Sequence, residues 1–420
     1  MSALTSAQIQ AVLLETVNTV VPKMFESGDS TMMLFSGGKK LSTTTRSFRQ
    51  ALMMSPGGNY RYVDFEGDYG TGSAYVPALA TSVPVERLVA TQLTARIPML
   101  TDSNQKSVLN LLTEQMQNSV DEWDTMTDRD IQGSGNGIFA TIASGGVSGT
   151  TLTLASPFYE QGMRVNDIYY VQDSGQTLTR GSFSVVSIDE VNHTIVISSL
   201  PAGTVAGDVI VIEGYGTATT TTLQGIAYHQ NNSSSGTWEN LSRSTYPYLR
   251  TPSLNASGTL TVAYLQKLVT LVNMYKGGIV KTGTADWVWH THPIQTTELI
   301  GQLQQQAFVP FARGTANEDI DPGFKVRSEM QVCGITMHTS NHASRTRVDL
   351  LKRSNWFRIQ YKDVGPAPMG DGNTTWLPMY GASGGYGGQN VMYLSAAEQV
   401  CVEDPRAGGY VYNVTEPSGY

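Results

Sequence analysis

The stretch SNQKSVLNLLTEQMQNSVDEWDTMTDRDI at residues 103–131, followed by GSGNGI at residues 133–138, decides the fold of this chain. Apolar side chains recur along the first part at three- and four-residue spacing, which predicts one long amphipathic helix. Its apolar face is expected to consist of Val108, Leu112, Met116, Val120 and Trp123. Thr101, Asp102 and Ser103 are candidate caps. The glycines at 133–137 end the helix and form a hinge.

The second half of this helix is acidic and contains a single basic residue, Arg129. Its carboxylates belong to Glu114, Asp121, Glu122, Asp124, Asp128 and Asp130. One interpretation is a solvated helix face. Our hypothesis is that basic residues of an N-terminal arm meet this face across a subunit interface, with Lys39, Lys40, Arg46 and Arg49 as candidates.

Extended, lysine-free chain precedes the helix, because no lysine lies between Lys40 and Lys106. Residues 55–100 predict a two-stranded ribbon with a flexible tip, which leaves along Tyr60, Tyr62 and Phe65 and returns along residues 83–95. An isolated ribbon is at best marginally stable in water and needs a surface to lie on, which we expect to be another chain. Further upstream, apolar spacing over residues 5–24 predicts a helix that ends at Pro22.

Short alternating runs after the hinge predict an inserted β-domain over residues 138–222, either a small barrel or a sandwich, with a hairpin around residues 189–193. The pattern is mixed from residue 254 onward. It predicts a helix over residues 260–275, a strand at 287–289 that leads into a helix from Pro293 to about Gln306, and a glycine-rich loop at 381–388. Further strands are expected at residues 332–338, 356–361, 391–402 and 409–415.

The composition favours β-structure and long ordered loops, since only 15% of the 420 residues are charged while glycines number 42. The net charge of −8 argues against a protein that binds nucleic acid through a basic face, but a mildly acidic wall suits a container for DNA. Cys333 and Cys401 are interpreted as two buried free thiols. With neither a signal peptide nor a long apolar run, we expect a soluble product of a reducing cytoplasm.

No motif in the sequence predicts a catalytic, cofactor-binding or metal site, and no cofactor is expected. His290 and His292 share one strand face, and His338 and His342 are four apart, but no cysteine or carboxylate cluster completes a metal site. Asp124, Asp128 and Asp130 mimic part of a calcium loop without its glycine and its terminal glutamate. Nucleotide-binding loops and a nucleophile elbow are absent. The aromatic stretch at residues 238–248 is interpreted as domain packing.

The order of these parts resembles the major capsid proteins of tailed bacteriophages, whose fold is named after phage HK97. Three places support the resemblance: the helix that ends in the 133–138 hinge, the strand-to-helix step WVWHTHP at 287–293, and CGITMHTS at 333–340. The last looks like the family's strand pattern of glycine, alternating hydrophobic residues and serine. Together they span the chain from about residue 55 to its end.

The resemblance implies an α+β, HK97-like fold with an inserted all-β module. It assigns residues 1–54 to an N-terminal arm, 55–100 to the E-loop and 101–137 to the spine helix of the peripheral domain. Residues 138–222 are the inserted β-domain, and residues 223–282 continue the peripheral domain. The axial domain is expected over residues 283–389, and return strands of the peripheral domain over residues 390–420.

The implied function is that of a virion protein which assembles in the bacterial cytoplasm into hexamers and pentamers of an icosahedral shell around double-stranded DNA. Its expected partners are further copies of itself, a portal protein, a separate scaffolding protein and in some shells a decoration protein. DNA is contacted non-specifically, and no membrane is involved. The lysine-free ribbon excludes the lysine cross-link of the type member, and the starting Met1 predicts an arm that is not removed.

Three alternatives remain open. An encapsulin-like nanocompartment would share the fold but load a cargo enzyme. A β-rich extracellular binding protein would explain the abundance of threonine, glycine and asparagine, although it predicts a signal peptide. A metal-dependent enzyme would rest on the histidines alone.

Overall fold

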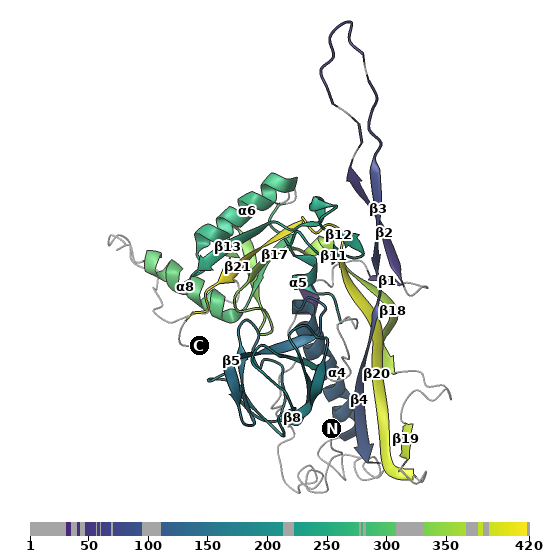
Figure 1. Ribbon diagram of the computed structural model, residues 1–420, viewed down its shortest axis with the longest axis vertical. Helices are drawn as coiled ribbons and strands as arrows, with labels where there is room; N and C mark the ends of the chain where they lie inside the picture. Colours follow the sequence, from purple (N-terminus) through teal and green to yellow (C-terminus); the bar gives the residue numbers. More distant parts are fainter. Residues whose placement is uncertain are drawn as a thin grey trace, which may run out of the picture.

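A computed structural model shows a body made of two sheets and a barrel, from which a long ribbon projects (Figure 1). It describes residues 31–34, 40–42, 47–55, 57–58, 60–68, 70–94, 111–212, 222–276, 279, 283–307, 331–366, 377–380 and 386–417. The helix predicted at residues 5–24 lies outside these ranges. So do the candidate caps at residues 101–103 and the first two turns of the predicted long helix, residues 103–110.

The long helix α4 (Leu111–Gln132) ends at the predicted hinge. Gly135 and Gly137 take the left-handed backbone conformation, with φ of +79° and +69°, which glycine adopts without strain. The chain returns beside this point, since the Thr222 amide donates to the Gly135 carbonyl over 3.1 Å. Gly225 then packs so tightly on the helix end that an added Cβ would lie 2.0 Å from the carbonyl oxygen of Ile131. The segments that enter and leave the barrel therefore lie side by side.

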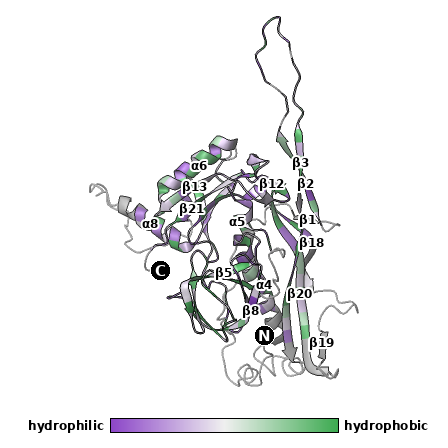
Figure 2. Ribbon diagram, viewed as in Figure 1, coloured by the Kyte–Doolittle hydropathy of each residue, from purple (hydrophilic) through white to green (hydrophobic). Residues whose placement is uncertain are grey.

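A mixed six-stranded sheet forms one half of the body. Its strand order is β13 (Ser253–Gly258), β21 (Gly408–Val414), β17 (Val348–Lys352), β14 (Trp287–Thr291), β16 (Ile335–Thr339) and β15 (Gln331–Val332). Helices α6 (Val262–Lys276) and α8 (Pro293–Ala307) pack on it. Leu265, Leu268 and Val272 of α6 are buried against Trp289, as their spacing predicted, and hydrophilic and hydrophobic bands alternate along the helix (Figure 2).

A second sheet has five strands and carries α4. Its path is β1 (Lys40–Ser42), β18 (Trp356–Pro366), β20 (Tyr386–Val402) and β19 (Leu377–Tyr380), and β4 (Val85–Thr94) pairs with β20. Trp123 of α4 packs on this sheet against Val89, Leu394 and Ala396. Val120 was predicted to lie on the apolar, buried face of α4. This prediction is wrong, because Val120 is 40% exposed.

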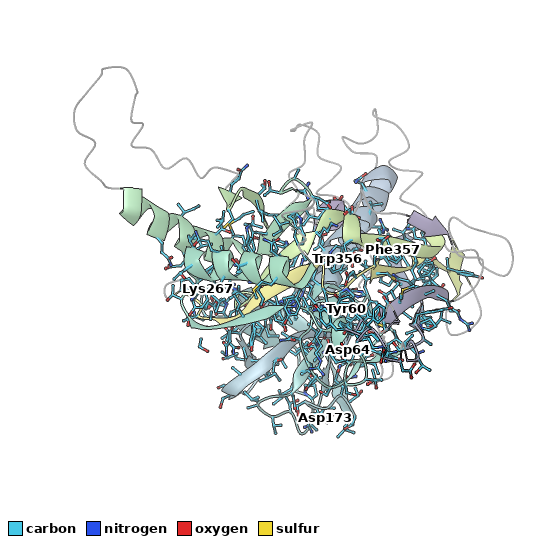
Figure 3. All side chains as sticks on the ribbon, turned by 90° about the horizontal axis from the view of Figure 1, so that it is seen from above. Tyr60, Asp64, Asp173, Lys267, Trp356 and Phe357 are labelled. Atoms are coloured by element: carbon cyan, nitrogen blue, oxygen red, sulfur yellow. The ribbon has the colours of Figure 1, made fainter. Side chains whose placement is uncertain are left out.

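The six strands after the hinge close into an antiparallel barrel in the order β10-β5-β6-β9-β8-β7. They are β5 (Ile138–Ser148), β6 (Thr151–Ala155), β7 (Ile168–Gln172), β8 (Thr179–Asp189), β9 (Thr194–Ile197) and β10 (Val209–Ile212). The predicted hairpin is β8–β9. The barrel has its own core, which includes Leu152, Val171 and Ile195. Seen from above, Asp173 of the barrel lies near one edge of the body, and Trp356 and Phe357 lie toward the opposite edge (Figure 3).

The ribbon consists of β2 (Phe48–Ser55) paired with β3 (Val76–Ser82), and it therefore begins before the predicted residue 55. Two expectations about it are wrong. The tyrosine-rich segment forms a loop rather than a strand, and the predicted return strand leaves the ribbon as β4 to pair with β20. The buried face of β4 also differs from the predicted one. Leu88 was expected to be buried but is 54% exposed, while Arg87 and Val89 face α4. Alternation defines two faces of a strand but does not select its partner.

Short elements connect these parts: α2 (Thr31–Leu34), α5 (Ile226–His229), the hairpin β11 (Thr237–Trp238) and β12 (Leu241–Ser242), and the 3-10 turns η1 (Pro247–Leu249) and η2 (Arg353–Asn355). A shared core joins α2, α4, α5 and both sheets. It contains Leu34, Ile131, Leu223, Ile226, Val288, Leu351, Trp356, Val400 and Val402. The two sheets are thus held to each other through the end of α4.

Three further expectations need correction. The strand predicted at 332–338 is a hairpin, because Cys333 and Gly334 both have positive φ (56° and 72°) and form its two-residue turn. Cys333 is therefore exposed, and only Cys401 is the buried free thiol that was expected. The glycine-rich loop was predicted at residues 381–388, but its last three residues, from Tyr386 onward, belong to strand β20. The strands β13 and β21 lie in one sheet with β14, β15, β16 and β17.

Candidate assembly surfaces

The loop at the end of the ribbon, which the structure describes at residues 57–58, 60–68 and 70–75, is here called the tip. Its side chains at Tyr60, Tyr62 and Phe65 are 90%, 92% and 102% exposed. Tyr60 and Tyr62 pack edge to face, with ring centroids 5.6 Å apart. The tip is closed by a main-chain bond from the Gly58 amide to the Ser73 carbonyl over 2.8 Å. An exposed aromatic cluster on a projecting arm marks an interaction surface.

The paired strands β2 and β3, here called the root, are held by the body. Leu52, Met54 and Ala80 pack on Trp238 and Leu249, which are buried. The Thr81 amide donates to the Glu239 carbonyl over 3.0 Å, and the Gln50 amide group donates to the Glu403 carbonyl over 3.2 Å. The aromatic stretch that begins at Trp238 serves packing, as predicted, and its partner is the ribbon.

A buried charge cluster joins β4, β18 and β20 under α4. Arg87 and Arg358 both donate to the carboxylate of Glu398, which is 1% exposed. Arg87 also donates to the Thr127 hydroxyl over 2.9 Å, and its guanidinium carbon lies 4.6 Å from the Trp123 ring centroid. Burial alone would raise the pKa of Glu398, but the two guanidinium groups and their hydrogen bonds hold it below its usual value.

The acidic face of α4 finds basic partners within its own chain. Arg164 of the barrel lies 3.8 Å from Glu122, and Arg87 lies 3.9 Å from Asp130. Asp128 and Arg129 are buried, at 1% and 5% exposed, so a solvated face is wrong for this end of the helix. Of the arm residues in our hypothesis, Lys39 and Arg46 lie outside the described ranges, Lys40 is in β1, and Arg49 is exposed on β2.

The barrel is fastened to the six-stranded sheet by a polar stack. His193 of the β8–β9 turn stacks on Tyr159, with ring centroids 3.8 Å apart, and its Nδ1 lies 3.2 Å from Glu160. The Tyr159 hydroxyl donates to Glu416 over 3.0 Å, and Arg345 donates to the other oxygen of Glu416 over 2.8 Å. Sequence reasoning missed this contact, because the stack joins residues far apart in the chain.

Three of the four histidines of the metal hypothesis make hydrogen-bond contacts within the fold. His290 and His338 face each other across paired strands, with 3.1 Å between their Nδ1 atoms, and His290 Nε2 lies 2.8 Å from Oε1 of Gln132 in α4. His292 Nδ1 accepts the Ile294 amide over 3.2 Å at the start of α8. Burial lowers the pKa of His290 and of His292 to about 3. His342 is fully buried.

Over the described ranges, there is no group of three or more histidine, cysteine, aspartate or glutamate side chains that could hold a metal ion. Among the helices found there, none combines the length and the apolar character needed to cross a membrane. The features that stand out are instead surfaces and joints: an exposed tip, an anchored root and a fastened barrel.

Neither a family model nor a curated protein matches the sequence. Solved structures do match. The cyanophage A-1(L) capsid asymmetric unit aligns with a TM-score of 0.59 at 11% identity, over 98% of this chain and 100% of that one. The capsid of the native GTA particle aligns with a TM-score of 0.48 at 9% identity, over 98% of each chain. The SrpI encapsulin of Synechococcus elongatus PCC 7942 aligns with a TM-score of 0.47 at 8% identity, over 98% of this chain and 97% of that one.

The fold is therefore the HK97-like capsid fold, with mixed helices and strands. The expectation from the order of the sequence parts is confirmed at the level of the fold.

Proposed function

We propose that this chain is a major capsid protein that self-assembles into hexamers and pentamers of an icosahedral head around double-stranded DNA. The observation that carries the proposal is the ribbon, whose aromatic tip is exposed while its root is buried in the body. In a lone subunit, the exposed aromatic rings of the tip remain in contact with water. Laid on a neighbouring copy, the tip would bury its rings and link two subunits.

The parts of the chain receive roles on the same basis. The sheet that carries α4 forms the peripheral domain, with α4 as the spine helix, and the six-stranded sheet with α6 and α8 forms the axial domain. The ribbon is the E-loop. Those residues of the range 1–54 that precede the ribbon form the N-terminal arm. The barrel is an insertion between the spine helix and the rest, which its adjacent entry and exit segments support.

The further partners follow from this role. They are a portal protein, a separate scaffolding protein and, in some shells, a decoration protein, and the virion is assembled in the bacterial cytoplasm. DNA would touch the inner wall without sequence preference, in keeping with the acidic net charge of −8. Noncovalent contacts would hold the shell together, since the described tip, residues 57–58, 60–68 and 70–75, has no lysine.

The test is expression of the chain with and without neighbouring phage genes, followed by light scattering and negative-stain imaging. Closed particles tens of nanometres across support a shell, and nuclease-protected double-stranded DNA inside them supports a head. Particles that enclose a co-expressed protein but never DNA would favour a cargo compartment. A chain that stays monomeric or dimeric under every condition contradicts the proposal.

A further inference from the structure

The root of the ribbon contacts a turn that contains an unusual residue. Glu239 and Asn240 connect β11 to β12, and both have positive φ, at 43° and 78°. This is the conformation of a two-residue type I′ turn, which favours asparagine and glycine. Glutamate in the first position is strained, and strain of this kind persists only where surrounding contacts impose it.

The surroundings of Glu239 explain what holds it. Its side chain is only 3% exposed and lies against the Ser82 side chain at the end of β3 and the Cys401 thiol of β20. Its main chain is used as well, because its amide donates to the Tyr228 hydroxyl over 2.8 Å and its carbonyl accepts from Thr81. One residue thus touches the ribbon, the second sheet and α5.

None of the basic groups nearby neutralises the carboxyl group. Over the described ranges, no lysine, arginine or histidine forms a salt bridge with Glu239. The Arg243 guanidinium donates to the carbonyls of Thr237 and Tyr228 over 3.1 and 2.9 Å. His229 shares hydrogen bonds with the Trp238 indole and the Val400 carbonyl, and burial lowers its pKa to about 4, so it is neutral. Arg49 of β2 is exposed.

A buried acid without a cation favours its neutral form. Burial raises the pKa of Glu239 to about 7 from 4.5, although Ser82 and Cys401 act in the opposite direction. The closed turn is therefore fully favoured below pH 4.5, and the advantage is lost as the pH rises through about 7. Above that pH, the closed turn must bury an uncompensated carboxylate.

We propose that Glu239 is a protonation latch for the ribbon: as a neutral acid it holds the β11–β12 turn closed over Ser82 and Cys401, and as a carboxylate it releases the root. The latch rests on the proposed capsid function only for its purpose, which is to free the ribbon for movement on a neighbouring copy. The latch itself is a property of the single chain.

Cys401 reports directly on the latch, because its thiol is fully buried under Glu239. In a Cys333→Ser background, which removes the exposed thiol, the rate of labelling by a disulfide reagent is measured from pH 5 to pH 9. Each rate is divided by the rate for the same chain with Glu239→Gln, which cancels the intrinsic ionisation of the thiol. The ratio is expected to rise steadily from pH 5 and to level off above about pH 7, by as much as ~80-fold over the whole range, which corresponds to the shift of the Glu239 pKa from 4.5 to about 7.

Glu403→Gln is the matched control, because Glu403 is an exposed carboxylate close to Cys401 in the chain and should leave the pH dependence intact. The proposal is overturned if the ratio of the two labelling rates does not change between pH 5 and pH 9. It is also overturned if Glu403→Gln removes the pH dependence of labelling as completely as Glu239→Gln does. Labelling is measured on the chain whether or not particles form. Failure of the latch is therefore distinct from failure of assembly.

Should Glu239→Gln not fold, amide hydrogen exchange on the Cys333→Ser chain tests the same point. After correction for base catalysis, the Thr81 amide should lose protection as the pH rises through about 7. The Ile142 amide, bonded to the Asp208 carbonyl within the barrel, should not. Equal pH profiles for the two amides overturn the proposal.

Discussion

The root and the tip of the ribbon belong to one stretch of chain but face opposite environments. At the root, Ala80 and its neighbours pack against Trp238, which is fully buried, whereas Phe65 at the tip is completely exposed. Both regions are rich in apolar side chains, so composition does not separate them. The root packs on a partner within the subunit, and in our proposal the tip packs on a neighbouring copy. The predictions below exploit this difference, because a change at the root should cost stability and one at the tip should cost assembly.

The largest effect is expected from replacing Tyr60, Tyr62 and Phe65 with serine together. Large aromatic anchors dominate interface energies, so the concentration at which particles form should rise at least ~100-fold. The thermal unfolding of the lone subunit should stay the same, since these rings are exposed. Light scattering against concentration and differential scanning calorimetry give the two readings. Normal assembly would mean that the tip is not an interface.

Trp238→Ala is the corresponding change at the root. Removing a fully buried tryptophan should lower the free energy of unfolding by ~3–5 kcal/mol and loosen β2 and β3. Denaturant unfolding measures the loss, with Tyr248→Ala, an exposed aromatic in the same stretch, as the control. If both changes cost equally little, the root is not anchored as described.

A smaller loss of unfolding free energy is expected for a change in β4, the strand that follows the root and belongs to the second sheet. Arg87→Met removes one of the two cations that face the buried Glu398 and should cost ~3 kcal/mol. Because the pKa of Glu398 is lowered on folding, its contribution is present above the ordinary pKa and is lost as the pH falls through the lowered value. Glu398→Gln should therefore flatten the acid side of the stability curve. An unchanged acid limb would rule out this carboxylate as its source.

The smallest effects compare two turns with similar backbones. Gly58 at the tip and Asn240 in the β11–β12 turn beside the root have φ of +82° and +78°, so alanine at either position should cost ~1 kcal/mol locally. Only Asn240→Ala should lower the midpoint of global unfolding. Gly58→Ala should change only the hydrogen exchange of the tip, because the tip is not coupled to the body. Equal shifts of the midpoint would show that the tip and the root unfold together.

Sequence patterns located the regular elements well where one segment buries its own apolar face. The stripe of Leu265, Leu268 and Val272 gave α6, and the strand-to-helix step at Pro293 gave β14 and α8. Patterns failed where a distant partner decides. The strand predicted to close the ribbon pairs with β20 instead, since alternation does not encode which edge a strand joins. Cys333 looked like part of a buried strand until both turn residues proved to have positive φ.

The candidate surfaces follow the same division. The lysine-free ribbon and the glycine hinge can be predicted from the residues alone, because local composition and backbone preference suffice for them, whereas the aromatic tip was expected to be a strand. The burial of Asp128, Arg129 and Glu398, and the latch at Glu239, cannot be predicted in this way. A charge is expected in water unless the fold brings it a partner or encloses it, and those neighbours come from β3, β4, β18 and β20. Local side-chain chemistry therefore specified many of the elements, and only tertiary packing decided which polar groups are enclosed and which apolar groups stay exposed.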